Sequence, residues 1–355
     1  QILASAPLFP KFVSEGVAMY HELRKRGTSR HVRIISAEDI GRALSYRTLA
    51  DALAEAFRAE IAVPVRHHHT ITRPGRDATL LLMPAWTAAP DGFLGCKLVT
   101  VFPDNAKLDR PSLYGLYLLL SGATGEPLAM LEGRALTAWR TAAASALAAR
   151  YLARADATRL LMVGAGALAR HLVRAHAAVR PIETVTLWNR TRRGAEELAS
   201  ALAGTGLTVS VVDDLESAVR AADIISCATL SSTPLLRGAW LRDGAHIDLV
   251  GGFTPAMREA DDETVRRARI YVDTRAGALN EAGDIVDPIA RGIIVPADIA
   301  GDLFDLCRGK VPGRTAQGEI TLFKSVGTAI EDLAAAMLVW RNMALGPGDN
   351  AAQSA

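Results

Sequence analysis

Hydrophobic and polar positions in the first third of the chain predict short helices followed by an antiparallel sheet. Leu49, Leu53 and Phe57 recur at helical spacing, so we expect an amphipathic helix over residues 46–60. Val32–Ile35 predicts a strand, and the sequence from Ser36 resembles a capping box that begins a short helix. Apolar segments bounded by Gly, Pro and Asp predict four more strands, at Thr79–Met83, Gly92–Phe102, Ser112–Leu120 and Pro127–Glu132.

From Ala135 onward, helical and extended patterns alternate, which predicts a doubly wound parallel sheet. A long alanine-rich helix over residues 135–155 precedes an apolar run typical of a buried strand, Leu160–Val163. The later expected elements are strands at Val185–Trp188, Leu207–Val212, Asp223–Cys227, Ala245–Val250 and Ile270–Asp273, and helices at Arg192–Ala203, Asp214–Ala221 and Glu259–Arg269. A final amphipathic helix is expected over Gly318–Leu345.

The turn after Leu160–Val163 reads Gly164-Ala165-Gly166-Ala167-Leu168-Ala169, a G-x-G-x-x-A pattern. The first glycine permits a tight turn, the second lets the backbone approach a pyrophosphate, and the small Ala169 lets the helix pack close to the sheet. Free N–H groups at the helix start attract phosphate. Strand, turn, helix and second strand together predict a Rossmann-type dinucleotide-binding domain. The alternative is a doubly wound domain that binds no nucleotide.

Residues after the second strand favour NADP(H) as the coenzyme. NAD-binding domains usually place a carboxylate there for the ribose 2′-hydroxyl. This chain instead has Asn189, Arg190, Thr191, Arg192 and Arg193, whose guanidinium and hydroxyl groups suit a 2′-phosphate. Use of NAD(H) as well is left open, and a solvated helix start is the structural alternative for these arginines.

Composition excludes several classes of protein. Half of the 355 residues are hydrophobic and the formal net charge is +2, so a large core is expected and no affinity for nucleic acid or an anionic membrane. No apolar run reaches the ~18 residues that span a bilayer. Cys96, Cys227 and Cys307 are few and lack metal-binding spacing, which favours a reducing, cytoplasmic location without disulfides.

Three cations before the glycine turn are candidates for binding a carboxylate. Arg66 follows a helix, Lys97 lies inside an apolar strand, and Arg140 lies near the start of the alanine-rich helix. A lysine in an apolar strand needs a partner or a ligand, and an arginine near a helix N-terminus makes that end more electropositive. A surface arginine, an edge-strand lysine and a snorkelling arginine are the structural alternatives.

The run His67-His68-His69 raises the question of a metal, and we expect none. In a strand, only His67 and His69 share a side, and no carboxylate or cysteine cluster lies nearby. We favour a role for one of these histidines in lining a pocket.

The chain resembles the ornithine cyclodeaminase/μ-crystallin family from about Val32 to Met343. The matching segments are Val32–Ser36, Leu82–Pro84, Gly95–Lys97, Leu136–Ala143, Gly164–Gly166 and Thr321–Gly327. The resemblance implies a first, α+β domain for dimerisation and substrate, with a nucleotide domain inserted before the last helix. We therefore expect an extension at 1–30, a substrate domain at 31–145 plus 315–345, a nucleotide domain at 146–314, and a tail at 346–355. The resemblance also implies that Arg66, Lys97 and Arg140 hold the substrate carboxylate, with Lys97 and Arg140 as catalytic residues.

Two departures from the family's cyclodeaminases change the expected reaction. Those enzymes carry a catalytic aspartate where this chain has Phe253, and a glutamate before Leu-Met-Pro where it has Leu81. The segment Gly252–Glu259 is instead similar to the Δ1-pyrroline-2-carboxylate reductase branch. The resemblance thus implies reduction of Δ1-pyrroline-2-carboxylate or Δ1-piperideine-2-carboxylate to L-proline or L-pipecolate. Phe253, Leu81 and Trp86 suit an apolar ring, and His68, His69 or a water held by Lys97 remain open as proton donors.

Three other functions remain as alternatives: ornithine cyclodeamination, alanine or opine-type amino-acid dehydrogenation, and nucleotide-dependent binding without turnover. We expect a homodimer that acts on a small molecule. The expected substrate-binding residues are Arg66, Lys97, Arg140, Phe253 and Trp86. The expected coenzyme-binding residues are Thr141, Gly164, Ala165, Gly166, Ala167, Leu168, Asn189, Arg190, Thr191, Arg192, Cys227, Ala228, Thr229, Lys324 and Ser325.

Overall fold

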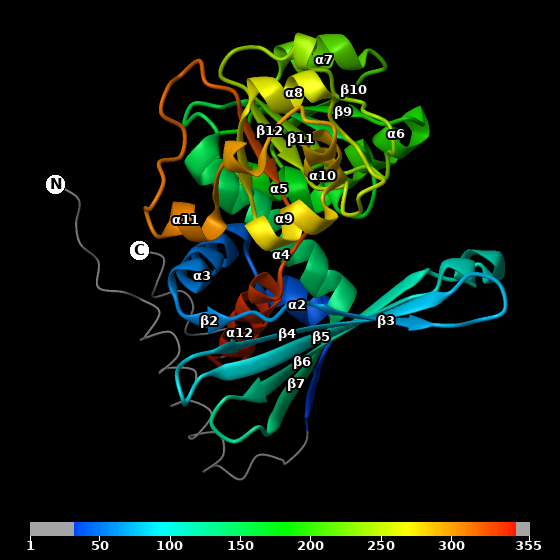
Figure 1. Ribbon diagram of the computed structural model, residues 1–355, viewed down its shortest axis with the longest axis vertical. Coiled ribbons are helices and arrows are strands. Elements are labelled where there is room, and N and C mark those ends of the chain that lie inside the picture. The colour runs from blue at the N-terminus through cyan, green and yellow to red at the C-terminus, as the bar shows by residue number, and fades with distance from the viewer. Residues whose placement is uncertain (1–31, 346–355) are drawn as a thin grey trace. The chain divides into compact units, whose positions relative to one another are not determined.

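The computed structural model describes residues 32–345, whose contacts form two compact units (Figure 1). Residues 141–327 form one, which we call the parallel unit. The described residues before and after them form the other, which we call the antiparallel unit. The extension expected at 1–30 and the tail expected at 346–355 lie outside the described residues.

The antiparallel unit is built on a seven-stranded sheet with the order β1-β7-β6-β5-β4-β2, in which β3 also pairs with β4. Its strands are β1 (Arg33–Ile35), β2 (Ile61–Ala62), β3 (His67–Ile71), β4 (Ala78–Thr87), β5 (Phe93–Val101), β6 (Leu113–Ser121) and β7 (Pro127–Glu132). Its α-helices are α2 (Ala37–Ala43), α3 (Tyr46–Arg58) and α12 (Ala329–Leu345). The helix α12 packs on β4, β5 and β6 and also contacts α2 and α3.

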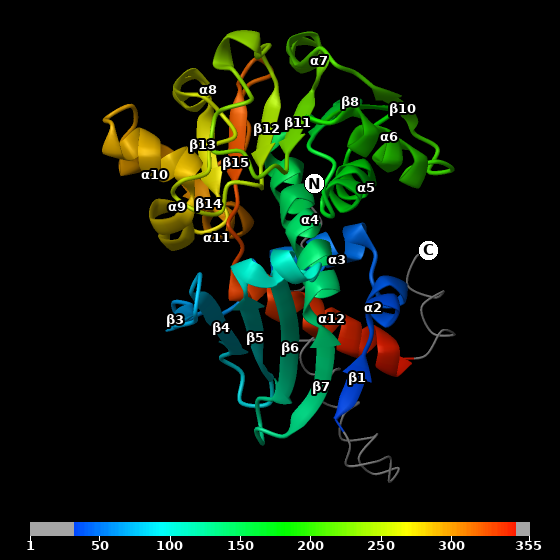
Figure 2. The same cartoon turned by 90° about the vertical axis from the view of Figure 1, so that its right-hand side faces the viewer.

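Strand alternation gives this sheet one covered and one open face. Met83, Lys97 and Tyr117 are direct cross-strand neighbours, and all three are buried on the face that α12 covers. Figure 2 shows α12 crossing behind the strands. The alternate residues, on the opposite face, are apolar and partly exposed: Leu82, Pro84, Trp86, Leu94, Leu98, Leu116, Leu118 and Leu120.

The parallel unit contains an eight-stranded, all-parallel sheet with the order β10-β9-β8-β11-β12-β15-β13-β14. Its strands are β8 (Arg159–Val163), β9 (Thr184–Trp188), β10 (Thr208–Val211), β11 (Ile224–Cys227), β12 (His246–Leu249), β13 (Arg269–Val272), β14 (Ile299–Asp302) and β15 (Thr321–Lys324). Its α-helices are α5 (Ala169–Val179), α6 (Arg192–Ala201), α7 (Leu215–Ala221), α8 (Asp262–Arg267), α9 (Arg275–Glu281), α10 (Gly283–Ala290) and α11 (Leu303–Cys307). The helix α4 (Gly133–Leu152) leads into β8.

The winding of this sheet reverses beside its first strand. The chain runs outward from β8 to β9 and β10, and β11 then pairs on the other side of β8. In open parallel sheets, ligands bind outside the carboxyl ends of the strands at such a reversal. The expected class, a doubly wound parallel sheet accompanied by an α+β unit, is therefore confirmed.

The helix expected over Gly318–Leu345 is wrong in its first third. Residues Thr321–Lys324 form β15, which lies inside the sheet between β12 and β13, and the helix begins only at Ala329. All four residues of β15 are buried, so the strand shows no alternation, and the spacing of Leu322 and Val326 imitated a helix. The units consequently divide at Arg140 and Gly327, whereas the sequence placed the divisions at 145 and 314.

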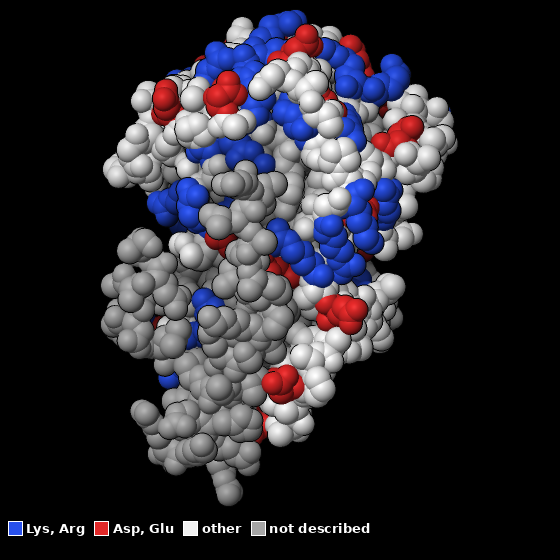
Figure 3. All heavy atoms as spheres, turned by 90° about the vertical axis from the view of Figure 1, so that its left-hand side faces the viewer, with Lys and Arg blue, Asp and Glu red and all other residues white. Residues whose placement is uncertain are grey.

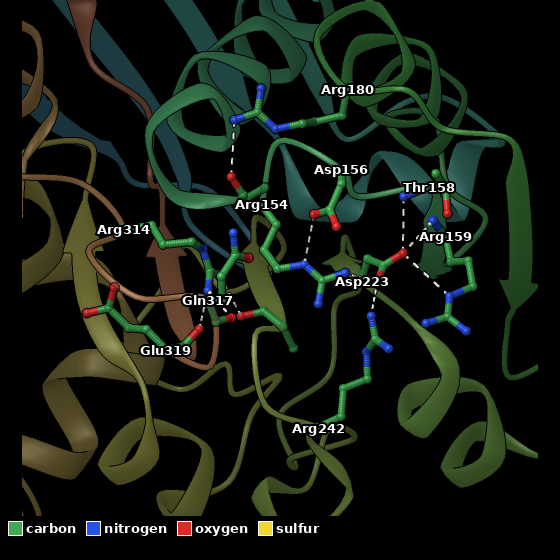
Figure 4. A network of polar contacts seen from close by, with 12 residues as sticks. Arg154, Asp156, Thr158, Arg159, Arg180, Asp223, Arg242, Arg314, Gln317 and Glu319 are labelled. Atoms are coloured by element: carbon green, nitrogen blue, oxygen red, sulfur yellow. Dashed lines mark hydrogen bonds and ion pairs between the residues drawn. The ribbon is translucent and has the colours of Figure 1, made fainter.

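A buried carboxylate, Asp223, ties together the amino ends of the parallel strands (Figure 4). It accepts hydrogen bonds from the backbone N–H groups of Thr158 and Arg159 (3.1 and 2.9 Å) and from the guanidinium of Arg154 (3.0 Å). The guanidinium of Arg242 pairs with the same carboxylate. Because Asp223 directly precedes β11 and Arg159 begins β8, this contact fixes the two strands at which the winding reverses.

Charges of both signs are mixed on the face of the described residues that Figure 3 shows. Over the described residues visible in Figure 3, Lys and Arg side chains form separate groups with Asp, Glu and uncharged surface between them. Proteins that bind nucleic acid usually present a continuous basic groove to its backbone. Among the helices of residues 32–345, none is both long and apolar enough to cross a bilayer.

We expect Asp223→Asn to destabilise the protein by about 3 kcal/mol, because the partly buried guanidinium groups of Arg154 and Arg242 lose their counter-charge and a buried amide donor can face backbone N–H groups. Urea unfolding followed by tryptophan fluorescence measures the loss. The matched control is Asp156→Asn, since Asp156 pairs with the same Arg154 but its side chain is 74% exposed. If both variants unfold at the same urea concentration as the unmodified protein, Asp223 does not hold the strands.

Candidate functional site

The glycine turn has the geometry of a phosphate-binding loop. Gly164 has φ +101°, and a Cβ there would lie 2.7 Å from the carbonyl oxygen of Ala228, so only glycine fits. A Cβ at Gly166 would meet nothing within 4 Å, which leaves open space over the turn. The helix α5 starts at Ala169 without a side-chain cap. The N–H groups of Ala169 and His171 donate to the carbonyls of Gly166 and Leu168 (3.0 Å each), so the helix dipole is what attracts an anion to this end.

The loop after β9 is fastened to the glycine turn by Asn189. Its Oδ1 accepts from the N–H of Ala165 (3.2 Å), and its Nδ2 donates to the carbonyl and hydroxyl oxygens of Thr191 (2.9 and 3.0 Å). These contacts satisfy the amide inside the protein. Asn189 and Thr191 therefore shape this edge of the expected coenzyme site.

The arginines of this loop differ in their partners. Arg192 pairs with Glu196 (3.0 Å) and Asp213 (2.5 Å), and Arg193 pairs with Glu197. Arg190 is exposed and forms no hydrogen bond or ion pair with the described residues. Arg190 is thus the guanidinium best able to meet an anion from solution.

The other expected coenzyme residues lie mainly inside the parallel unit. Cys227 is buried at the end of β11, and the N–H of Ala228 donates to the carbonyl of Val163 (2.9 Å). The side chain of Lys324 is fully buried and faces Asp284 (3.4 Å). This edge therefore offers backbone and small side chains to a ligand, while the Lys324 ammonium points into the interior.

Two further expected coenzyme residues, Thr141 and Ser325, are also buried. Thr141 belongs to α4, where the parallel unit begins, and Ser325 follows β15. The N–H of Ser325 donates to the carbonyl of Leu249 (3.2 Å), which continues the sheet pairing.

In the antiparallel unit, Lys97 and Arg140 share one carboxylate. The Nζ of Lys97 lies 2.7 Å from Oδ2 of Asp332, and the Nε of Arg140 lies 3.1 Å from Oδ1 of the same residue. Arg140 also donates to Glu331 (2.5 Å). The two carboxylates are fully buried in the first turn of α12, and the sequence analysis missed both. Two consecutive acids opening an otherwise apolar helix were the available signal.

Electrostatics places Arg66 in the same neighbourhood. Burial lowers the pKa of Lys97 to about 8; Asp332 opposes this shift, while the positive charges of Arg140 and Arg66 add to it. Among these five charged groups, the three cations exceed the two carboxylates by one. A cluster with that balance suits a ligand carrying one negative charge.

Leu81 and the three consecutive histidines divide between the two faces of the antiparallel sheet. Leu81 pairs with His68, and both lie on the Lys97 side of β4. His67 and His69 lie on the other side, with ring centroids 6.3 Å apart. No group of three possible metal ligands occurs among residues 32–345. Of the two histidines considered as proton donors, only His68 shares a face with Lys97.

The expected role of Trp86 is not supported by the strand register. Trp86 is one residue out of phase with Met83, the cross-strand neighbour of Lys97, so it points to the open face of the sheet. Its apolar ring suggested a place beside a ring substrate, whereas the pleat puts its side chain and that of Lys97 on opposite faces.

Phe253 lies in the loop after β12, where the sequence departs from the cyclodeaminases. It follows Gly251 and Gly252 and is 49% exposed. It is thus an apolar ring presented at the carboxyl edge of the sheet, in a position where a cyclodeaminase would need an acid.

Comparisons with known proteins agree with these features. Residues 30–346 match the model of the ornithine cyclodeaminase/mu-crystallin family. A Δ1-pyrroline-2-carboxylate reductase of Colwellia psychrerythraea is 40% identical, over 88% of this chain and 100% of its own. The solved Thermococcus litoralis Δ1-pyrroline-2-carboxylate reductase with NADH and L-proline has a TM-score of 0.82 at 34% identity, covering 88% and 97%. An archaeal alanine dehydrogenase dimer with NAD has a TM-score of 0.80 at 30% identity, covering 88% and 95%.

A double-mutant cycle tests the coupling of Lys97 to Asp332. We expect Asp332→Leu alone to cost about 3–5 kcal/mol of stability, because a buried ammonium loses its partner. The double variant Lys97→Met/Asp332→Leu should regain part of that loss, since the unpaired charge is then gone. Urea unfolding of the four proteins measures the cycle, and losses that simply add would contradict the coupling.

Proposed function

The chain belongs to the ornithine cyclodeaminase/mu-crystallin family, and we propose that it reduces cyclic ketimine acids with NADPH. The proposed substrates are Δ1-pyrroline-2-carboxylate and Δ1-piperideine-2-carboxylate, giving L-proline and L-pipecolate. The observation that carries the proposal is the pair of apolar residues, Phe253 and Leu81, where cyclodeamination needs carboxylates. Relatives and a solved structure named as reductases of the five-membered imine support it.

The cation cluster suits the substrate's single carboxylate. In the proposal, Arg66, Lys97 and Arg140 bind it, and Asp332 and Glu331 keep the cations in place. The ring of the substrate carries no further charge, so an apolar surface such as Phe253 suits it. A second ammonium, as in ornithine, would have no carboxylate at Phe253 or Leu81 to pair with, at a cost of several kcal/mol.

Reduction needs one hydride and one proton. The bound coenzyme supplies the hydride for the imine carbon. Lys97 is the group in this chain best suited to hold the proton, because its lowered pKa of about 8 lets the ammonium release a proton near neutrality. His68, on the same face of the sheet, is the second candidate, and it can act directly or through water.

The choice of NADPH rests on the loop after β9. It carries no carboxylate for a ribose 2′-hydroxyl, and Arg190 stands exposed beside the engaged Arg192 and Arg193. A guanidinium of this kind suits a 2′-phosphate. The two solved structures with a similar fold contain NADH or NAD, so we base the preference for NADPH on the residues of this chain and not on those structures.

The open face of the antiparallel sheet supports a homodimer as part of the proposal. Apolar side chains from three neighbouring strands share it, among them Leu98, Leu118 and Trp86. A contiguous apolar face of this kind marks a protein interface. The alanine dehydrogenase with a similar fold is described as a dimer.

A substrate panel tests the proposed function. We expect NADPH oxidation with both cyclic imine acids and no ammonia from ornithine, because Phe253 and Leu81 stand where a carboxylate would exchange protons with its amine. The absorbance of NADPH measures its oxidation, and an ammonia assay measures deamination of ornithine. Oxidation with pyruvate and ammonia instead would favour an amino-acid dehydrogenase. Coenzyme binding without any turnover would favour a binding protein.

Coenzyme preference is tested at Arg190. We expect Arg190→Ala to weaken NADPH binding about thirtyfold, which corresponds to about 2 kcal/mol, and to leave NADH binding unchanged. The matched control is Arg193→Ala, since Arg193 already pairs with Glu197. Fluorescence titration gives the constants. Equal affinities of the unmodified protein for NADH and NADPH would refute the preference.

Oligomeric state is tested on the open face. Leu98→Lys places a charge in the centre of the proposed interface, where it would be buried unpaired, so we expect dissociation into monomers. Light scattering after gel filtration measures the molar mass. Leu230→Lys, at an isolated leucine that is 75% exposed in the parallel unit, serves as the control. A monomeric unmodified protein would contradict the dimer.

A further inference from the structure

One buried carboxylate, that of Glu259, joins the carboxyl ends of β11 and β12. Its Oε1 accepts hydrogen bonds from the N–H and the hydroxyl of Thr229 (2.7 and 2.8 Å), in the loop after β11. Its Oε2 accepts from the N–H groups of Gly251 and Gly252 (2.7 and 3.3 Å), in the loop after β12. Glu259 is fully buried, so four donors from two loops stabilise its charge in place of water.

A second set of contacts holds Glu259 itself. The Oδ1 of Asp284, near the start of α10, accepts from the backbone N–H groups of Glu259 and Ala260 (2.8 and 3.1 Å). The Nζ of Lys324 lies 3.4 Å from the other oxygen of Asp284. Both side chains are fully buried. The carboxylate of Glu259 is therefore placed by residues from α10 and β15.

The loop after β12 packs so closely against Glu259 and its neighbours that glycine is required at two of its positions. A Cβ at Gly251 would lie 1.9 Å from the carbonyl oxygen of Thr229 and 2.5 Å from Oε1 of Glu259. A Cβ at Gly252 would lie 2.8 Å from Oδ2 of Asp284. The first side chain beyond this packed segment is Phe253, which is half exposed.

Sheet order places these two loops at the nicotinamide end of a bound dinucleotide. The adenosine half lies beyond the end of β9 and the pyrophosphate lies over the turn after β8. The sheet order is β9-β8-β11-β12. A dinucleotide that runs from β9 across β8 therefore places its nicotinamide half at the ends of β11 and β12. Thr229 and Gly251 are in those loops, whereas Arg190 and the glycine turn belong to the other half.

We propose that Glu259 is a positioning residue of the coenzyme site, whose ionised carboxylate holds the loops after β11 and β12 in the conformation that receives the nicotinamide. The inference rests on the proposed use of NADPH, and it adds a residue that touches neither substrate nor coenzyme. Protonation removes one acceptor, so one of the two loops loses its attachment while the glycine turn stays intact.

Burial, modified by the neighbouring charges, brings the protonation of Glu259 near neutrality. Burial raises its pKa to about 7; the Lys324 ammonium opposes the shift, and the Asp284 carboxylate adds to it. The neighbouring Cys227 thiol stays neutral, because burial raises its pKa well above the usual value. The carboxylate is ionised above about pH 7, so nicotinamide binding weakens as the pH falls through that value.

The experiment compares NADPH with 2′-phospho-ADP-ribose, which keeps the pyrophosphate and lacks only the nicotinamide ring. Dissociation constants of the full chain are measured by NADPH fluorescence and by competition, from about one unit below to one unit above the pKa of about 7. Titration of the 2′-phosphate affects both ligands, so the ratio of the two constants isolates the nicotinamide half. We expect the ratio of the NADPH constant to the 2′-phospho-ADP-ribose constant to rise about fivefold to tenfold from the upper to the lower pH.

Glu259→Gln keeps the shape of the side chain but places an amide donor against N–H groups. We expect it to raise the NADPH constant about tenfold above pH 7, to abolish the pH dependence of the ratio, and to leave 2′-phospho-ADP-ribose binding unchanged. The matched control is Glu263→Gln, an exposed residue of α8, which should match the unmodified protein in all respects.

Three results would overturn the proposal: unchanged NADPH binding in Glu259→Gln, equal weakening of both ligands, or a pH-independent ratio in the unmodified protein. The last needs no variant, so it decides the matter even if Glu259→Gln fails to fold. Failure to reduce any imine acid would refute the proposed reaction and leave this test valid, because it measures binding alone. If NADPH does not bind, NADH and ADP-ribose replace the two ligands.

Discussion

The antiparallel unit depends on the burial of two cations against one carboxylate. An ammonium and a guanidinium removed from water are tolerable only when a counter-charge meets both, and Asp332 does so from the first turn of α12. This fixes the helix on the sheet and explains why Lys97 can lie in an apolar strand. Burial and the charge of Arg140 lower the pKa of Lys97 while Asp332 opposes them, so the contact that stabilises the unit also limits how readily its lysine loses a proton.

Local patterns predicted most of the fold. The glycine turn, the strands β8 and β9, and the capping box at Ser36 each depend on a few neighbouring residues, and the structure contains all of them. The strand β15 was mistaken for helix because burial on both faces removes the alternation that identifies a strand. Residues 274–317, which form short helices and β14, gave no clear period and therefore no prediction.

The sequence predicted those parts of the candidate site that a residue type or a short local motif identifies. The cations and the glycine turn stand out by type and spacing, but Arg140 and Glu331 are 191 residues apart, and no pattern within a segment connects them. The role of Glu259 was equally unpredictable, since it depends on hydrogen-bond donors in two different loops. Trp86 was expected near the substrate because of its residue type, but residue type does not fix the strand register that puts it on the other face from Lys97.

The position of β15 also determines when the protein can fold during synthesis. The strands β12 and β13 both pair with β15 and not with each other, and β14 pairs only with β13. Until residues 321–324 leave the ribosome, the nascent chain holds two separate groups of strands whose facing edges lack a partner. The antiparallel unit waits longer still, because its counter-charges come with α12. Emerging chains of this protein therefore carry unpaired edges and uncompensated cations for most of their synthesis, which makes the interval before α12 the period of greatest exposure to aggregation.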